Sequence, residues 1–307
     1  MCHLSPRFVR FIVIILLLLL ASLACSIQKD DQGQADIDIQ LTTIAIQQTQ
    51  TAVVVPPIQI PTTENVQPTQ PVAVTESIPT PSPDIDFEGI SFSFDDSITS
   101  SVSTEIVPQQ VDEYQFPGGT YPTHYAFNFN GYALQDTFHQ PIIRIYPIAM
   151  FETLDSYTSD DINQLRTLLQ TQPPIAVNDN LPLIPHWNAG QMFSAKAEYM
   201  DFQNGSGVRY LTMHGQAAYP IDNTNMFYAF QGITNDGAYL VSAILPIANP
   251  ALPLHGEDTI DNWTTFYDLY ESYMGQASQQ VNEYEAISFV PSLDMLDAMI
   301  ASIYVNK

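Results

Sequence analysis

Two strand–turn–strand patterns in the second half of the chain limit the possible folds more than any other feature of the sequence. Residues 195–218 read AKAEYMDFQNGSGVRYLTMHGQAA, and we place their turn at residues 204–207. Residues 226–247 form the second pattern, with a turn at residues 235–237. Asn and Gly supply the positive φ that a tight hairpin turn requires. Residues 239–245 are apolar almost throughout, so we expect this strand at the centre of a sheet.

Three further strands are predicted before these hairpins. The first lies in EGISFSFDDSI, with Phe92 and Phe94 on one face. The second lies in THYAFNFNGYAL, where Tyr125, Phe127 and Phe129 alternate with smaller or polar residues. The third is PIIRIYPI. Such alternation is typical of strands with one buried face.

Helical periodicity occurs between the strands and again at the end of the chain. The segment SDDINQLRTLLQTQ predicts a helix capped by Thr158 or Ser159. Two C-terminal helices follow, within residues 261–286 and 291–305. The apolar positions expected to be buried on these three helices are Ile162, Leu165, Leu168 and Leu169, then Phe266, Leu269, Tyr270 and Tyr273, then Leu293, Leu296, Met299, Ile300 and Ile303. Hairpin-linked strands with helices after them predict an α+β fold: an antiparallel sheet with packed helices and a helical C-terminus.

The first 25 residues have the layout of a secretory signal. Arg7 and Arg10 precede an apolar run with no acidic residue, and small residues follow it. The apolar run spans residues 11–25 and is shorter than the ~20 residues that a membrane-spanning helix needs. A signal-anchor helix stays open as an alternative, because tilting and local thinning tolerate some mismatch.

The residues Ser22-Leu23-Ala24-Cys25 resemble the lipobox of bacterial lipoproteins. In that family a diacylglycerol is attached to the cysteine thiol, a peptidase cuts before the cysteine, and several acyl chains anchor the protein. The resemblance therefore implies lipid attachment at Cys25 and an extracytoplasmic protein held on the cell membrane or outer membrane. The alternative is an ordinary signal peptide that is cut nearby and leaves a free cysteine.

Composition divides the remaining chain into a tether and a domain. Residues 26–83 form a tether rich in Pro, Thr and Gln, and the composition of residues 56–83 favours an extended, disordered linker without a packed core. For residues 35–55 the spacing slightly favours a short, marginal helix, and a disordered linker is the alternative. Residues 84–307 carry the strand and helix patterns and are long enough to bury a substantial core. The sequence has 2 cysteines, so cleavage before Cys25 leaves one and excludes an internal disulfide.

The charge balance restricts the partners. The chain has 33 acidic residues against 8 Lys and Arg, a net charge of −25. Phosphate contacts need clustered basic side chains, so we expect no nucleic-acid partner. Membrane contact is expected through the lipid on Cys25, and the other partner is an unidentified envelope ligand or protein.

No motif identifies a reaction. The five histidines beyond the signal are His124, His139, His186, His214 and His255, and none forms an HExxH or another metal-spaced pair. No GxSxG nucleophile elbow occurs. We therefore assign no catalytic, cofactor-binding or metal residues, and expect a non-catalytic binding or envelope-assembly role. Two alternatives remain: a cell-envelope hydrolase built around His214 or His255 with nearby carboxylates, and a purely structural surface protein.

Aromatic residues cluster around the FPGG turn. They are Tyr114, Phe116, Tyr121, Tyr125, Phe127, Phe129 and Tyr132. Aromatic platforms occur on carbohydrate-binding faces, but aromatics that alternate along a strand usually pack in a core. We favour core packing.

Three segments together resemble a recurring module of uncharacterised bacterial lipoproteins. They are GSGVRYLTMHGQ, FYAFQGITNDGAYLVSAILPI and FVPSLDMLDAMIASIYV. The likeness covers most of residues 84–307 and carries over no catalytic or binding residue. The strand and helix pattern is also similar to the layered α/β/α sandwich of the PsbP and Mog1 type.

Overall fold

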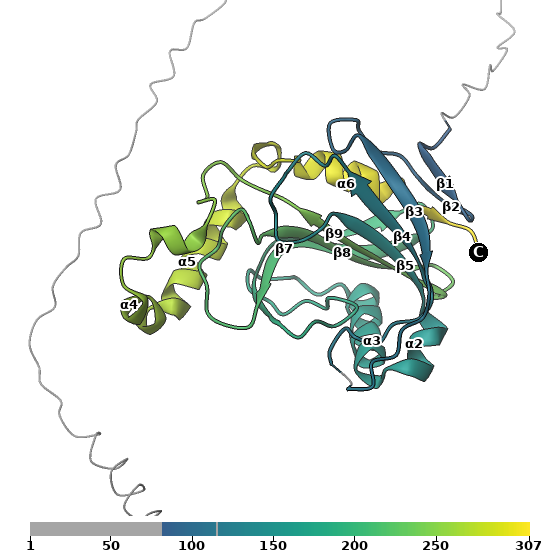
Figure 1. Cartoon of the computed structure of the whole chain (residues 1–307), viewed down its shortest axis with the longest axis horizontal. Coiled ribbons are helices and arrows are strands. Elements are labelled where there is room, and N and C mark those ends of the chain that lie inside the picture. Colours follow the sequence, from purple (N-terminus) through teal and green to yellow (C-terminus); the bar gives the residue numbers. More distant parts are fainter. Residues whose placement is uncertain (1–81, 115) are drawn as a thin grey trace, which may run out of the picture. The chain divides into compact units, whose positions relative to one another are not determined.

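The computed structural model describes residues 82–114 and 116–307, which form a large antiparallel sheet, a small sheet and packed helices (Figure 1). The strand order of the large sheet is β3-β4-β5-β9-β8-β7-β6. Its strands are β3 (Ser101–Val107), β4 (His124–Asn130), β5 (Ile142–Pro147), β6 (Gly190–Phe202), β7 (Gly205–Gly215), β8 (Phe227–Thr234) and β9 (Tyr239–Pro246). The predicted α+β class, with an antiparallel sheet and C-terminal helices, is confirmed.

The path of the chain explains this strand order. Strands β3, β4 and β5 run inward from one edge of the sheet. The chain then passes through α2 (Ile148–Leu154) and α3 (Ser156–Thr171) to β6 at the opposite edge. Strands β6 to β9 return to the middle, where β9 pairs with β5. The prediction that the apolar strand after the second turn lies centrally is confirmed.

The large sheet has a hydrophobic core on each face. Along β9, Val241 and Ala243 belong to one core, while Leu240 and Ile244 belong to the other. This alternation follows from the two-residue period of a strand, and apolar residues at every position reflect burial on both faces. Helices α2 and α3 cover one face, whereas α5 (Tyr270–Glu283) and α6 (Leu293–Ala301) lie on the other (Figure 1).

The first hairpin forms, but its turn is not where we predicted it. Strand β6 ends at Phe202 and β7 begins at Gly205, so the turn residues are Gln203 and Asn204. Gly205 and Gly207 already belong to β7, and neither is among the residues with positive φ. A Cβ on Gly207 would lie 2.3 Å from the ring of Phe230. The glycine is therefore needed for close packing of an aromatic ring, a requirement that the local pattern does not distinguish from a turn.

The second turn is confirmed. Strands β8 and β9 join through residues 235–238, and Gly237 has φ +72°. The hydroxyl of Thr234 donates to the carboxylate of Asp236 at 2.6 Å, and the same carboxylate accepts from the Ala238 amide at 3.0 Å. These bonds satisfy the polar groups of the turn and fix the register of the hairpin.

Helix α3 begins three residues earlier than the predicted start. Its N-cap is Asp155, whose carboxylate accepts a bond from the Tyr157 amide at 3.0 Å. The predicted cap Thr158 is buried inside the helix and donates its hydroxyl to Asp155. Ile162 and Leu165 are buried as predicted, and the helix ends at Thr171, followed by the C-cap residue Gln172, which has the left-handed conformation before Pro173.

Two elements had no clear sequence signal. Strand β3 carries Ser101, Ser103 and Glu105 on one face and is exposed at most positions, because it forms an edge of the sheet. Helix α2 is a short helix that begins directly after a strand, with Pro147 at its N-cap. Neither has the long apolar periodicity on which the predictions relied.

Residues 261–286 contain two helices where one was predicted. Helix α4 (Trp263–Asp268) ends at Leu269, and α5 begins at the next residue. Phe266 is buried as predicted, but Leu269 is 57% exposed because it lies at the break. All five apolar residues predicted to be buried in the last helical segment are buried: Leu293, Leu296, Met299, Ile300 and Ile303.

The small sheet joins the two ends of the described region. Its order is β1 (Ile85–Phe87), β2 (Ile90–Phe92) and β10 (Tyr304–Val305). The predicted strand in EGISFSFDDSI is therefore β2, which pairs with the end of the chain and not with the large sheet. Phe92 and Phe94 both pack near Phe129, as their shared face predicted.

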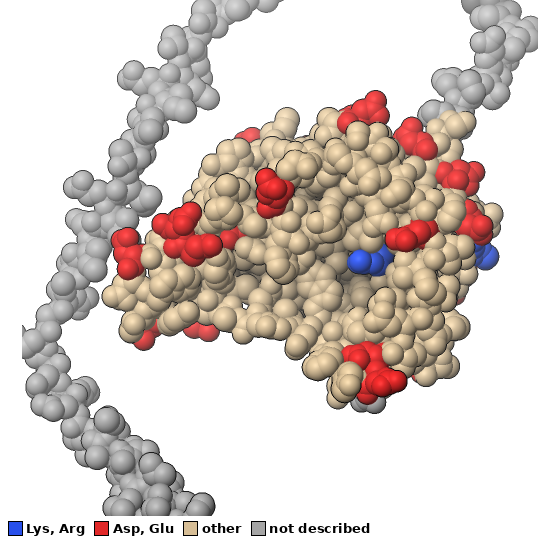
Figure 2. Space-filling model, viewed as in Figure 1, with Lys and Arg blue, Asp and Glu red and all other residues tan. Residues whose placement is uncertain are grey.

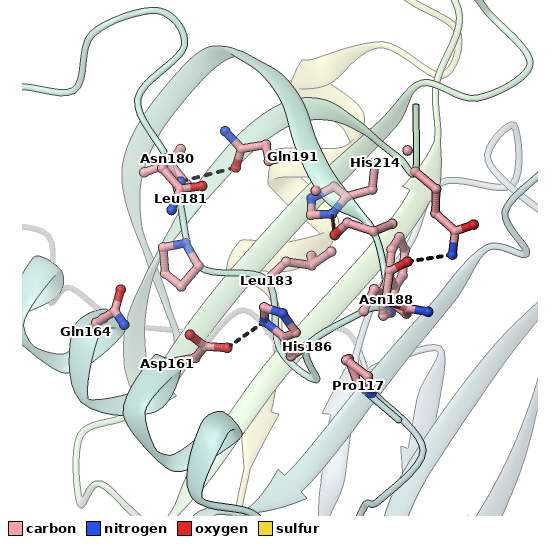
Figure 3. A pocket seen from close by; sticks show the side chains of 16 residues that line it. Pro117, Asp161, Gln164, Asn180, Leu181, Leu183, His186, Asn188, Gln191 and His214 are labelled. Atoms are coloured by element: carbon pink, nitrogen blue, oxygen red, sulfur yellow. Dashed lines mark hydrogen bonds and ion pairs between the residues drawn. The ribbon is translucent and has the colours of Figure 1, made fainter. Parts of the chain in front are cut away.

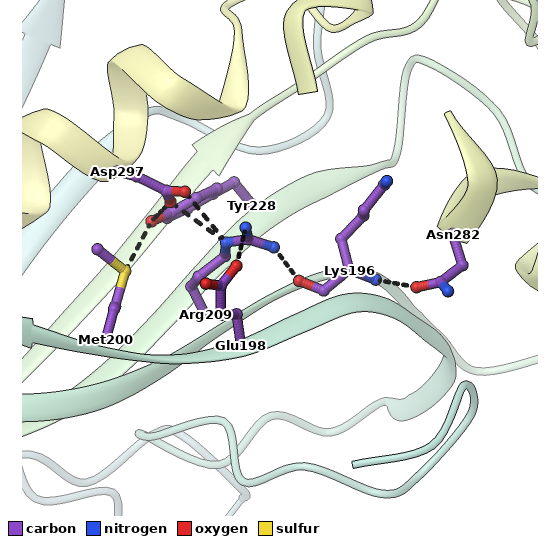
Figure 4. Close-up of polar contacts among 7 residues, drawn as sticks. All are labelled: Lys196, Glu198, Met200, Arg209, Tyr228, Asn282 and Asp297. Atoms are coloured by element: carbon purple, nitrogen blue, oxygen red, sulfur yellow. Dashed lines mark hydrogen bonds and ion pairs between the residues drawn. The ribbon is translucent and has the colours of Figure 1, made fainter. Parts of the chain in front are cut away.

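A buried ion cluster attaches α6 to the sheet (Figure 4). Arg209 of β7 is buried and pairs with Glu198 at 2.8 Å and with Asp297 of α6 at 3.2 Å. Its guanidinium also donates to the backbone carbonyl of Lys196. The hydroxyl of Tyr228 donates to Asp297 at 2.8 Å, and burial raises the pKa of the Asp297 carboxyl. The guanidinium thus has partners on three sides, as a buried charge requires.

Among the described residues, 82–114 and 116–307, no helix is both long and apolar enough to cross a membrane.

Candidate functional site

A cleft of about 750 Å³ opens beside α3 (Figure 3). One wall is the segment from Asn180 to Ala189, in the connection between α3 and β6, and it continues into the first two residues of β6, Gly190 and Gln191. The first turns of α3 contribute Asp161 and Gln164, and the end of β7 contributes His214. Pro117 comes from the loop between β3 and β4. Four separate parts of the chain therefore meet at this cleft.

Buried hydrogen bonds hold the wall segment against the sheet. The amide of Ile184 donates to the side-chain oxygen of Gln231 at 3.1 Å, and the Ser242 hydroxyl donates to the Ile184 carbonyl at 2.6 Å. Gln231 in turn donates to Ser242 at 3.0 Å. Both side chains come from the central strands β8 and β9 and are almost completely buried. The buried polar side chains of Gln231 and Ser242 are thus hydrogen-bonded by the backbone of Ile184 in the wall segment.

A second set of bonds fixes the upstream part of the wall. Gln191 accepts from the Leu181 amide at 3.1 Å and donates to the Asp179 carbonyl at 2.9 Å. The Ser194 hydroxyl donates to the same carbonyl at 2.8 Å. The wall is consequently bonded to β6 as well as to the sheet centre, so the cleft is a preformed feature of the fold.

The rings of Trp187 and His214, which line the cleft, pack with the rings of His139 and Phe227. His139 stacks on Trp187 with ring centroids 5.0 Å apart and an interplanar angle of 19°. Phe227 contacts His139 at a centroid distance of 4.5 Å and Trp187 at 5.6 Å. His214 lies edge-on to Trp187 at 5.4 Å. This packing holds the indole ring in one orientation.

The two histidines of this ring cluster are neutral at physiological pH. Burial lowers the pKa of His139 to about 4, with a smaller effect from His214. Burial likewise lowers the pKa of His214 to about 4. The Nδ1 atom of His214 lies 3.4 Å from the Ala189 carbonyl, so it carries the hydrogen and leaves Nε2 as an acceptor. That Nε2 atom is buried and has no hydrogen-bond partner among the described residues.

His186 and Asp161 are hydrogen-bonded to each other in the lining of the cleft. Nδ1 of His186 lies 3.1 Å from Oδ2 of Asp161, and the pair links the wall segment to α3. Burial raises the pKa of the Asp161 carboxyl, and the bond to His186 partly offsets that effect. Within the described residues, no hydroxyl group hydrogen-bonds to His186.

A second cleft of about 380 Å³ adjoins the first. The two clefts share Pro117 and His186. Phe116 and Tyr157 line the second cleft and are 60% and 74% exposed. Tyr114 packs beside Phe116 with ring centroids 6.2 Å apart. The aromatic residues of the FPGG loop therefore extend the site beyond the first cleft.

The structure separates the aromatic residues that the sequence placed in one cluster. Phe127, Phe129 and Tyr132 are buried, so core packing is confirmed for them. It is wrong for Tyr114 and Phe116, which lie on the surface. The reason is that they lie in a loop: alternating residues share a buried face only where the chain forms a strand.

The two histidines favoured for a hydrolase occupy different places. His214 lines the cleft, but no carboxylate or hydroxyl hydrogen-bonds to it among the described residues. His255 lies outside the cleft and contacts the hydroxyl of Thr224 at 3.1 Å. The predicted combination of one of these histidines with a carboxylate and a hydroxyl therefore does not form in this part of the chain. The histidine that meets a carboxylate is His186, which sequence reasoning did not single out.

Asp161, His186 and Trp187 are the cleft residues that the sequence reasoning missed. His186 and Trp187 are adjacent in a segment without helical or strand periodicity, and a conspicuous aromatic–imidazole pair in a loop is the signal that was available. The lipid attachment residue Cys25, the signal segment 1–25 and the tether up to residue 81 lie outside the described residues.

Across the two described ranges, no group of three or more His, Cys, Asp or Glu side chains is arranged to hold a metal ion.

Comparisons with protein-family models, with curated proteins and with solved structures give no match for this chain.

Proposed function

We propose that this chain is a lipid-anchored extracytoplasmic protein whose domain binds a ligand at the cleft beside α3, in a binding or envelope-assembly role without catalysis. Cys25 is the proposed attachment point to the cell membrane or outer membrane. The anchor rests on the resemblance of residues 22–25 to a lipobox, and the binding role rests on the cleft.

The size and construction of the cleft carry the binding proposal. Its volume of about 750 Å³ falls within the roughly 300–1,000 Å³ that is usual for ligand pockets. Its wall is fixed by Gln231, Ser242 and Gln191, so a ligand would enter a preformed site and little ordering entropy would oppose binding. A purely structural surface protein predicts no such cleft.

The anchor is tested by substitution of the cysteine. The full chain is expressed in a bacterium that processes lipoproteins and is labelled with radioactive palmitate. We expect label on the wild type and its loss in Cys25→Ala, with release of the variant from the membrane fraction. Cys2→Ala is the matched control and should keep the label. Equal labelling of the wild type and Cys25→Ala would reject the anchor.

Binding is tested through the fluorescence of Trp187. The sequence has 2 tryptophans, and Trp263 packs against Tyr219 and Tyr267, outside the cleft lining. In the full chain with Cys25→Ala and Trp263→Phe, the emission reports on Trp187 alone. An envelope extract is separated into peptide, anionic-polymer and neutral-glycan fractions, and each is titrated. A saturable change with any fraction supports binding at the cleft; no change with all three rejects it.

The His186–Asp161 pair favours a second candidate, a cell-envelope hydrolase. A carboxylate 3.1 Å from an imidazole nitrogen can orient that ring as a general base for water. Turnover of an envelope fraction by the wild type and its loss in Asp161→Asn, detected by chromatography of the products, would support this reaction. Binding without any new product would support the non-catalytic role.

A further inference from the structure

We infer that the cleft and the aromatic surface beside it bind a neutral oligosaccharide; this inference rests on the proposed binding function and specifies its ligand. Three independent features lead to this class of ligand: the charges at the site, the unpaired amide side chains, and the continuous aromatic surface.

The charges at the site disfavour anionic ligands. No Lys or Arg lines either of the two clefts in the described residues. The carboxylates that do line them already have partners: Asp161 bonds to His186, and Asp112 and Asp155 accept from backbone amides. Among the basic residues of the domain, Arg209 is buried with Glu198 and Asp297, and Arg166 lies near Glu152. Figure 2 shows acidic residues scattered over the visible surface and few basic ones. An anionic ligand would lose water at the cleft and gain no opposite charge.

Amide side chains supply the polar contacts. Gln164, Asn180 and Asn188 line the cleft and are exposed, and no described residue hydrogen-bonds to their side-chain amides. Each amide offers a carbonyl acceptor and two N–H donors. A hydroxyl group both donates and accepts, so neighbouring hydroxyls on a sugar ring match the two ends of one amide. Ligands with alternating donors and acceptors and no net charge therefore fit this rim best.

The base of the cleft supplies an apolar surface. His139, His214 and Phe227 pack around the Trp187 indole, which is only half-buried, and the part of the indole that lines the cleft is left to contact a ligand. Sugar rings present C–H groups on their faces, and these pack on aromatic rings.

The second cleft indicates a ligand longer than one sugar. It continues from the first at Pro117 and His186 and carries the exposed rings of Phe116 and Tyr157. One sugar unit would fill only part of this combined surface. Stacking positions at Trp187 and at the Phe116 loop suit successive units of a chain.

The test uses the full chain with Cys25→Ala and Trp263→Phe, and measures Trp187 emission. Cellohexaose and maltohexaose are the neutral probes, and a hexagalacturonate is the anionic control. We expect saturable binding of at least one neutral probe and binding of the hexagalacturonate that is weaker by about tenfold. Periodate oxidation, which cleaves the C–C bond between neighbouring hydroxyl-bearing carbons and converts both to carbonyls, should abolish binding of the neutral probe.

The location is tested by a double substitution. Gln164→Ala with Asn188→Ala should weaken binding of the neutral probe by about tenfold without changing the thermal midpoint. Gln280→Ala, on the exposed side of α5, is the matched control and should bind as the parent does.

Two results would overturn the inference. The first is no response to either neutral hexasaccharide up to millimolar concentration, which rejects the ligand class even if a peptide or anionic envelope fraction shows that the cleft binds something else. The second is unchanged binding in the double variant or after periodate treatment, which rejects the amide rim as the recognition surface.

Discussion

The imidazole of His139 stacks on the indole of Trp187 at a centroid distance of 5.0 Å, and this contact joins the loop before β5 to the wall of the cleft. His139 cannot gain a proton in this position without placing a charge among aromatic rings. The same constraint applies to His214, which packs against the edge of the indole. The ring cluster is therefore both the base of the candidate site and an acid-sensitive part of the fold.

Acid should destabilise the protein through these two histidines. Their pKa values fall from 6.5 to about 4 on folding, so the unfolded chain binds more protons between those values. Stability is then fully present above pH 6.5 and is lost as the pH falls towards 4, by up to about 3 kcal/mol for each histidine. Denaturant unfolding at a series of pH values should show that the free energy of unfolding falls less steeply towards acid pH in His214→Asn than in the wild type. His255→Gln, at an exposed site, should decline like the wild type; an identical slope for all three proteins would contradict this account.

Two glycines predict opposite effects of the same substitution. A Cβ at Gly207 would lie 2.3 Å from the Phe230 ring and 2.7 Å from the Gln231 carbonyl, so Gly207→Ala should destabilise by about 1–3 kcal/mol. Gly275 lies in α5 with no atom within 4 Å of its Cβ position. Gly275→Ala should therefore stabilise by roughly 0.5–1 kcal/mol through higher helix propensity. Urea unfolding of both variants measures the difference, and a loss of stability in Gly275→Ala would show that the α5 surface is not open.

The buried ion cluster predicts a large cost for removing one partner. Asp297→Ala would leave the Arg209 guanidinium and the Tyr228 hydroxyl without their shared carboxylate, and should cost about 3 kcal/mol in the free energy of unfolding. Asp294→Ala, on the same helix, should cost only about 0.5 kcal/mol, because its charge contributes through the helix dipole.

A double substitution tests whether the Arg209–Asp297 ion pair itself holds α6 on the sheet. Arg209→Met with Asp297→Leu removes both charges and should lose less stability than Asp297→Ala alone. A greater loss in the double variant would mean that the ion pair itself, and not the avoidance of an incompletely paired buried guanidinium, stabilises the attachment of α6.

Limited proteolysis tests the boundary of the tether. The Pro, Thr and Gln composition of residues 56–83 predicts cleavage there and a stable fragment that begins near Asp84. The hairpins are paired on both sides in the large sheet, so residues 204–247 should be protected. Early cleavage within 204–247, read by mass spectrometry, would place the boundary elsewhere.

Local patterns in the sequence predicted the hairpins, the central strand and the last helix because these elements follow a simple period. Tyr228 and Phe230 alternate with Phe227 and Ala229 between two cores, and Leu293 to Ile303 repeats at helical spacing. The same patterns misplaced the turn before Gly205, since a glycine needed under a phenylalanine ring looks identical to a turn glycine.

The candidate site was less predictable, because it is made by contacts between distant segments. His186 meets Asp161, and Trp187 meets His139, only when the wall segment crosses the sheet. No spacing rule joins these residues. His214 was recognised as a possible site residue, but its neighbours were predicted to be carboxylates and prove to be rings.

The pairing of β5 with β9 sets an order for folding during synthesis. β5 is complete once residue 147 has been made, yet its partner begins only at Tyr239. Until then a nascent chain exposes an apolar strand edge with Ile142, Ile143 and Ile145, which other chains could extend. A chaperone that covers this edge, or rapid arrival of the second hairpin, would therefore decide how much of the protein reaches its native state.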